Sequence, residues 1–270
     1  MIGARRVALG GAQLDEADSR IVIRSIEPAD GKESISAVGT AAGYGQRITG
    51  YRRETADIVV KFAIKARKTD LSTRAEVLEK ANAWAAKAAP ERGGAYMTVN
   101  YRSGRRIKAV LVQAPGEGDL WRWTDEFRIT FRAYNVPYWE DSSETTLVSE
   151  TGVTSNTSSV TVGGSAMTPL SVEFTNTASA TSDTFSISAD GKTIAFESLG
   201  LAVGEKLVID ENNGLFRARI KNTSNVYRSV LAKRTAASSD DLRVKPGTVS
   251  VVTASAKAGT LSVKYRGRYI

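Results

Sequence analysis

The chain of 270 residues contains no cysteine and no histidine. Without cysteine it can form neither a disulfide nor a thiolate that would act as nucleophile or metal ligand. Without histidine it lacks the side chain that enzymes use most often as a general base and metal sites use most often as a ligand. Few routes to catalysis are left, and we predict that the protein is not an enzyme and holds no cofactor and no metal ion.

Long apolar runs are missing as well. No stretch approaches the roughly 18 consecutive apolar residues that a membrane helix requires. Near the N-terminus only Val7–Leu9 is apolar before glycines and acidic residues follow, so we expect no signal peptide. The fractions of hydrophobic residues, 41%, and charged residues, 24%, are typical of a globular protein.

The net charge of +8 is spread over the chain. Residues 1–150 carry 23 basic against 20 acidic residues, and residues 151–270 carry 14 against 9. Nucleic-acid-binding proteins instead gather their cations on one face or along one stripe. The basic pairs Arg52-Arg53 and Arg105-Arg106 are short, and we interpret them as solvated surface residues. Nucleic-acid binding is therefore an alternative that rests on net charge alone.

One segment, residues 73–88, has the pattern of an amphipathic helix. Thr73 and Glu76 have the spacing of a capping box, in which two side chains satisfy free backbone donors at the helix start. Pro90 and the glycines after it end the helix. Trp84 is predicted to be a buried anchor, because aromatic rings bury a large apolar area. The apolar stripe consists of Val77, Leu78, Ala81, Trp84, Ala85 and Ala88.

The rest of the N-terminal part is predicted to consist of strands. In residues 56–68 apolar side chains alternate with others with a period of two, which indicates a strand with one buried face. Ser103-Gly104 is a turn signal between two further strands. The predicted strands are residues 20–27, 34–40, 56–68, 96–101, 105–113 and 121–134.

A change of composition predicts two domains. Residues 142–169 are rich in serine, threonine and glycine, which favours a linker. We therefore place an N-terminal β domain at residues 1–144 and a second domain at residues 145–270, with 145–169 forming a linker and the first strand. The second domain has short strands and the hairpin dipeptides Asp190-Gly191 and Asn213-Gly214, a pattern typical of a β-sandwich. Its later strands are predicted at residues 170–175, 185–188, 193–197, 206–210, 215–220, 248–255 and 260–270.

Two motifs that suggest ligands are explained better as turns. Gly191-Lys192-Thr193 matches the last three residues of a phosphate-binding loop. The position where that loop needs its first glycine is occupied by Ser186, and a strand follows where the loop needs a helix. The run Asp210–Gly214 lacks the spacing of a calcium loop, since the twelfth position is Lys221.

Tryptophans next to carboxylates are a pattern that also occurs in sugar-binding sites. Aromatic rings stack on sugars and carboxylate pairs serve glycosidases, but a buried tryptophan at a domain edge explains the pattern equally well. The candidates are Trp121, Trp123 and Trp139, with Glu117, Asp119, Asp125, Glu126, Glu140 and Asp141.

The order of several motifs resembles a known family. The helix LEKANAWAAKAAP (78–90) is followed by AYMTVNY (95–101), RRIKAVLV (105–112) and EFRITFRAYNVPYWED (126–141). The second half has GEKLVID (204–210), VKPGTVSV (244–251) and the closing YRGRYI (265–270), which is expected to form a last edge strand. This layout is similar to the distal tail protein family (Dit) of long-tailed, non-contractile phages.

The resemblance implies a mainly β fold, with an N-terminal β-barrel or sandwich that contains one helix and is related to tail-tube proteins, and a C-terminal galectin-like β-sandwich. It implies a structural virion protein, made in the host cytoplasm, that forms a ring, usually a hexamer, at the tail tip. Such a ring joins the tail tube protein to the hub or fibre protein, and the tape measure protein and DNA pass through its lumen. No catalytic residue belongs to the pattern.

Two points stay open at the level of sequence. Galectins use histidine among other residues, so inherited lactose-type binding is doubtful here, but a carbohydrate-binding adhesin or receptor-binding module of a phage tail is the alternative function. An enzyme acting on cell-wall glycans is a weaker one. A ring needs interfaces between neighbouring copies that close on themselves, and we expect the contact to involve residues 39–66.

Overall fold

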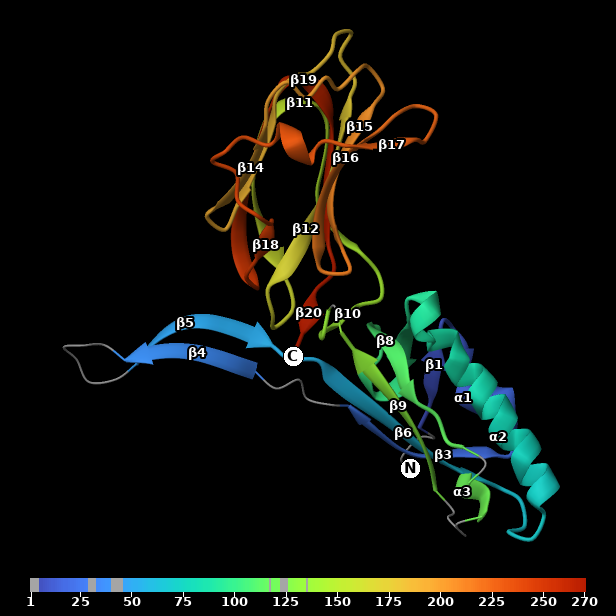
Figure 1. The fold of residues 1–270 in the computed structure, drawn as a ribbon. Coiled ribbons are helices and arrows are strands. Elements are labelled where there is room, and N and C mark those ends of the chain that lie inside the picture. The colour runs from blue at the N-terminus through green and yellow to red at the C-terminus, as the bar shows by residue number, and fades with distance from the viewer. Residues whose placement is uncertain (1–4, 29–32, 40–45, 117, 122–125, 135) are drawn as a thin grey trace. The chain divides into compact units, whose positions relative to one another are not determined.

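The computed structural model describes residues 5–28, 33–39, 46–116, 118–121, 126–134 and 136–270 (Figure 1). It divides into two compact units, residues 1–139 together with Ile270, and residues 140–269. Both units are built mainly of β-strands, so the predicted fold class is confirmed. No helix in the described part of the chain has the length and hydropathy of a membrane span.

The first unit contains an antiparallel sheet with the strand order β2-β1-β7-β8-β9-β6-β3. In its centre, the register of β6 and β9 places Ile58 opposite Phe131 and Phe62 opposite Phe127, and all four side chains are buried. The period-two pattern seen in the sequence therefore forms the core. The strands are β1 (Val7–Leu9), β2 (Ala12–Gln13), β3 (Ile21–Pro28), β6 (Ala56–Ile64), β7 (Ala95–Val99), β8 (Arg105–Gln113) and β9 (Phe127–Ala133).

Helix α2 (Leu71–Ala85) continues into the short helix η1 (Ala86–Ala88), and all six residues of the predicted apolar stripe are buried. The predicted start is wrong, however. Asp70 is the N-cap, and its carboxylate accepts a hydrogen bond of 3.1 Å from the backbone N–H of Thr73. Aspartate caps helices as well as threonine does, so the chain enters the helix earlier, and Glu76 pairs with Lys80 at 2.7 Å.

Some elements of the first unit depart from the predicted ones. Strand β6 ends at Ile64, where the N–H of Ala66 bonds back to the carbonyl of Ile64 and turns the chain. Strand β9 begins only at Phe127. The remaining helices have only three or four residues, too few to show a period in the sequence. They are α1 (Leu14–Ala17), α3 (Gly118–Trp121), η2 (Pro90–Arg92), η3 (Asn100–Arg102) and, in the second unit, η4 (Leu231–Lys233).

The second unit is a β-sandwich whose two layers share a pair of long strands, β11 and β19. The first half of β19 pairs with β13, the second half pairs with β12, and β11 runs antiparallel along both halves. The strands of the sandwich are β11 (Thr145–Val162), β12 (Thr168–Asn176), β13 (Phe185–Ala189), β14 (Lys192–Phe196), β15 (Lys206–Asn212), β16 (Leu215–Lys221), β17 (Tyr227–Ser229), β18 (Arg243–Val244) and β19 (Gly247–Tyr265). The short strands β10 (Trp139–Asp141) and β20 (Arg268–Tyr269) pair with each other and are not part of the sandwich sheet.

Residues 145–169 were predicted to form a linker and the first strand. The strand is present as β11, but it takes up most of the segment and leaves little linker. Its threonines and valines suit a pleated strand, and Val148, Val160 and Val162 are buried in the sandwich. The two strands predicted at 248–255 and 260–270 also form one continuous strand up to Tyr265.

Both predicted hairpin dipeptides adopt the backbone that they favour. Asp190 and Gly191 have φ of 49° and 74°, and Asn213 and Gly214 have φ of 52° and 81°. Positive φ at both central residues is the mark of the tight turn that matches the twist of two adjoining strands. The candidate phosphate loop and the candidate calcium loop are therefore hairpin turns, β13–β14 and β15–β16.

Candidate assembly surfaces

Strands β4 (Glu33–Gly39) and β5 (Gln46–Arg53) form a sheet of their own (Figure 1). Their antiparallel register pairs Glu33 with Arg53 and Ile35 with Tyr51, and it shifts once between Ser36 and Ala37. In the described part of the chain neither strand bonds to a further strand. A two-stranded hairpin is marginally stable by itself, and its outer edges present backbone groups that a third strand could satisfy.

The expected contact segment at 39–66 thus divides into two different elements. Strand β5 belongs to this free hairpin, whereas β6 lies between β3 and β9 and has no open edge. Residues 40–45 lie outside the described residues. The backbone pairing therefore makes the β4–β5 hairpin a candidate surface for assembly and leaves β6 in the core.

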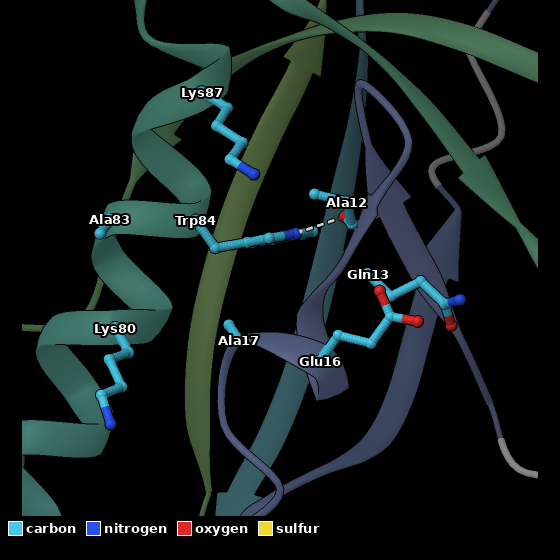
Figure 2. A pocket seen from close by; sticks show the side chains of 8 residues that line it. All are labelled: Ala12, Gln13, Glu16, Ala17, Lys80, Ala83, Trp84 and Lys87. Carbon is cyan, nitrogen blue, oxygen red and sulfur yellow. Dashed lines mark hydrogen bonds between the residues drawn. The ribbon is translucent and has the colours of Figure 1, made fainter.

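A hollow of about 340 Å³ lies beside α2 in the first unit (Figure 2). Trp84 lines it, with its indole Nε1 donating a hydrogen bond of 2.7 Å to the carbonyl oxygen of Ala12. Figure 2 shows two lysines on the α2 side and Glu16 on the α1 side, so the hollow carries charges of both signs. Such a lining favours no single class of charged ligand. The lining residues are Ala12, Gln13, Glu16, Ala17, Lys80, Ala83, Trp84 and Lys87.

Asp18 holds a cluster of charges next to this hollow. Its side chain is 6% exposed and accepts hydrogen bonds from Arg20, at 2.9 and 2.7 Å, and from Lys80, at 3.1 Å. The hydrogen bonds from Arg20, followed by that from Lys80, hold the pKa of Asp18 far below its ordinary value and outweigh the opposite effect of burial. The cluster ties α1 and the start of β3 to α2, which is a structural role.

A second charge cluster lies inside the sandwich. Glu211 is 4% exposed and bonds Arg268 and Arg243, each at 2.6 Å. Arg268 is itself buried, and its backbone N–H bonds the hydroxyl of Thr168 at 3.1 Å. The closing segment, with its two arginines, was expected to be a last edge strand. Its second arginine is buried and neutralises a carboxylate on the β15–β16 hairpin.

The sugar-binding candidates are not assembled into a site around Trp139. That ring is 4% exposed, and the guanidinium of Arg102 lies 5.2 Å from its centre. The Asp141 carboxylate accepts a hydrogen bond from the N–H of Gly267 at 3.1 Å. Stacking of a sugar on Trp139 is therefore excluded in this conformation. The Trp121 side chain and residues Glu117, Trp123 and Asp125 lie outside the described ones.

Other carboxylates form ion pairs with basic side chains. Asp210, the first residue of the candidate calcium loop, bonds Arg217 at 2.6 Å and Arg219 at 2.9 Å. Glu126 lies 3.9 Å from Lys61. In the described residues no three acidic side chains gather in a way that could hold a metal ion.

Neither a family model nor a curated protein matches the chain, but solved structures do. The crystal structure of the SPP1 Dit protein, described as a paradigm of the hub adsorption apparatus in phages infecting Gram-positive bacteria, superposes with a TM-score of 0.69 at 14% identity, covering 99% of this chain and 100% of that one. The chain has the Dit fold.

Two structures of the phage p2 baseplate in its activated conformation share the same fold. The one with strontium has a TM-score of 0.54 and the one with calcium 0.55, each at 7% identity and with 98% of both chains covered. The Dit fold therefore extends over both units of this chain in the same order. At these identities the likeness concerns the backbone.

Proposed function

We propose that this protein is a structural component of a phage tail, which forms a ring of identical copies at the tail tip. The observation that carries the proposal is the likeness to the SPP1 Dit protein over nearly the whole length of both chains. A match of one unit alone would suit many β-sandwiches, whereas the shared order of both units is specific to the fold. The role is one of assembly, without an enzymatic step.

The free β4–β5 hairpin supports a ring. Identical subunits in a ring contact each other through two different surfaces, and an open strand edge on one copy can extend a sheet of the next. The hairpin offers such an edge in the first unit. We propose that the first unit builds the ring, a hexamer, and that the sandwich is a galectin-like domain which projects outward.

The proposed partners follow from this position. The ring would join the tail tube protein on one side and the hub or fibre protein on the other, with the tape measure protein and DNA passing through its lumen. The location is the virion, at the tail tip. The alternative of a carbohydrate-binding adhesin has lost one of its candidates, since Trp139 is buried.

Reconstruction of intact tails by electron microscopy tests the proposal directly. We expect density for this chain as an annulus at the tail tip, and density anywhere else in the particle overturns the proposal. The purified chain offers a second test, in which negative-stain images show rings with a central hole. A variant with a short glycine-serine linker in place of residues 33–53 should form no rings but keep its melting temperature, because the hairpin shares no sheet with the first unit. Rings that persist without the hairpin show that another surface closes them.

A further inference from the structure

Strand β11 is an open edge of the sandwich. It has 18 residues and pairs with β19 on one side, and in the described part of the chain no strand pairs with its other side. From Ser155 to Val162 the pairing with β19 is regular, without a bulge. An extended, regular edge of this kind is a template for adding another strand.

The second half of this edge carries no charge. The run from Ser155 to Val162 has neither a charged residue nor proline, and its outward side chains are exposed. Proteins usually protect open edges with charges, proline or bulges, and two other edge strands here carry charges. Strand β3 exposes Arg24 and Glu27, and β17 exposes Arg228. The outward side chains of β11 in this run are Ser155, Thr157, Ser159 and Thr161.

Strand β14, another edge strand of the sandwich, is already covered. The N–H of Thr235 bonds the carbonyl of Ala195 at 2.9 Å, and the N–H of Ser239 bonds the carbonyl of Thr193 at 2.7 Å. Among the edges of the described residues, the run from Ser155 to Val162 of β11 thus combines regular pairing with a lack of charge.

The sheet face beside this edge is uncharged too. The outward residues of the neighbouring strand β19 are small and exposed, and the next strand, β13, presents two half-buried serines. In a chain with a net charge of +8, two copies repel each other over most of their surfaces, and an uncharged face is where they can meet. The residues are Thr248, Ser250, Val252 and Ala254 on β19, with Ser186 and Ser188 on β13.

We propose that β11 of one copy pairs antiparallel with β11 of a second copy, about a two-fold axis at Ser158. This register sets Thr157 opposite Ser159 and Ser155 opposite Thr161, so that hydroxyl-bearing side chains meet across the strands, which stabilises antiparallel pairs. In each pair the two residue numbers are both odd or both even. Because side chains alternate between the two faces along a strand, inward side chains therefore lie opposite inward ones, and outward side chains opposite outward ones. The sheet β14-β13-β19-β11 then continues into the second copy.

The limits of β11 select this register. Moving the axis toward the N-terminus brings in the pairing irregularities between Glu150 and Ser155, including Gly152 with φ of 70°. Moving it toward the C-terminus runs past Val162, where the strand ends. A contact of one edge with itself is two-fold and joins copies in pairs. It does not close a ring, so it is independent of the proposed function.

Sedimentation of the full chain over a range of concentrations tests the pairing. We expect pairs, or pairs of rings, for the wild type. Two variants, Thr157→Lys/Ser159→Lys and Thr157→Glu/Ser159→Glu, place like charges directly opposite each other and should weaken pairing about tenfold or more. Mixing them places each lysine opposite a glutamate and should restore the pairs. The matched control, Thr223→Lys/Ser224→Lys, adds the same charge on an exposed turn of the same unit and should pair like the wild type.

The outcomes separate pairing from ring formation. Rings would give six-fold masses in wild type and variants alike, whereas pairing gives a doubling that only the β11 variants lose. A wild type that never doubles its mass overturns the proposal. So does a doubling that survives in both variants, because then another surface makes the contact. Circular dichroism spectra unchanged from wild type exclude misfolding as the cause of a loss.

Discussion

The indole Nε1 of Trp84 lies 2.7 Å from the carbonyl oxygen of Ala12 and joins the helix to the edge of the sheet through a part-buried hydrogen bond. The same ring packs edge-on against Phe131, with 5.9 Å between ring centres. One side chain therefore connects α2, β2 and β9. The prediction that Trp84 is a buried anchor is confirmed, since the side chain is 2% exposed.

Replacement of this side chain tests how much it contributes. We expect Trp84→Ala to lower the free energy of unfolding by about 3–5 kcal/mol, because it leaves a cavity and an unpaired carbonyl. Trp84→Phe keeps an aromatic ring and loses the hydrogen bond, so its effect should be smaller. Urea unfolding measures both, and equal stability of Trp84→Ala and wild type would contradict the placement of the ring.

Acid should weaken the first unit through Asp18. Its ordinary pKa is 3.8, and Arg20 and Lys80 lower the pKa in the folded state. A carboxylate with a lowered folded-state pKa stabilises the fold above its unfolded-state pKa, and this stabilisation is lost as the pH falls from there toward the folded-state value. We expect Asp18→Asn to be less stable than wild type at neutral pH and to lose less stability below about pH 4.

Chemical unfolding at several pH values measures this difference. Glu91→Gln removes an exposed carboxylate from η2 and should follow the wild-type curve. If Asp18→Asn and wild type lose the same stability between neutral pH and pH 3, then Asp18 is not part of the acid response.

Glycine at position 259 is required by a close approach. A Cβ atom there would overlap the ring of Phe174, at the point where β19 passes along β12. We expect Gly259→Ala to lower stability by about 1–3 kcal/mol, as overpacked cores do. Gly116→Ala is the matched control, since a Cβ atom at that position meets no atom within 4 Å. Similar melting temperatures for the two variants would show that the Phe174 ring moves aside without cost.

The ion cluster around Glu211 should matter more than an exposed ion pair. Glu211→Gln leaves Arg268, 7% exposed on its side chain, without its countercharge, and breaking a buried pair in this way costs about 3–5 kcal/mol. Glu173→Gln breaks the more exposed pair with Lys206, where we expect at most about 1 kcal/mol. Differential scanning calorimetry of the two variants compares them directly, and a smaller loss for Glu211→Gln than for Glu173→Gln would contradict this ranking.

Local chemistry made much of the fold predictable. Asp190-Gly191 and Asn213-Gly214 determine their turns by themselves, and the stripe that contains Trp84 shows in the spacing of apolar residues. The prediction of the helix start was wrong because Asp70 and Thr73 are both good caps, and only the backbone decides between them.

Other features depend on residues far apart in the sequence. Strand β11 resembled a linker because serine and threonine occur in both, and its partner β19 lies about a hundred residues later. Arg268 and Glu211 are likewise distant, so nothing in YRGRYI alone indicates a buried arginine. Of the free β4–β5 hairpin, only the first strand was predicted, at residues 34–40, and β5 was missed. The separation of the hairpin from the main sheet depends on which strands pair.

The long strands β11 and β19 have a mechanical consequence for the sandwich. Since both strands cross from one layer to the other, neither layer can detach while the other stays intact. Opening either layer breaks backbone hydrogen bonds of the same continuous pair, so the whole unit should exchange its protected amide hydrogens in a single cooperative step. A domain of this kind resists being peeled apart when it is pulled from one end.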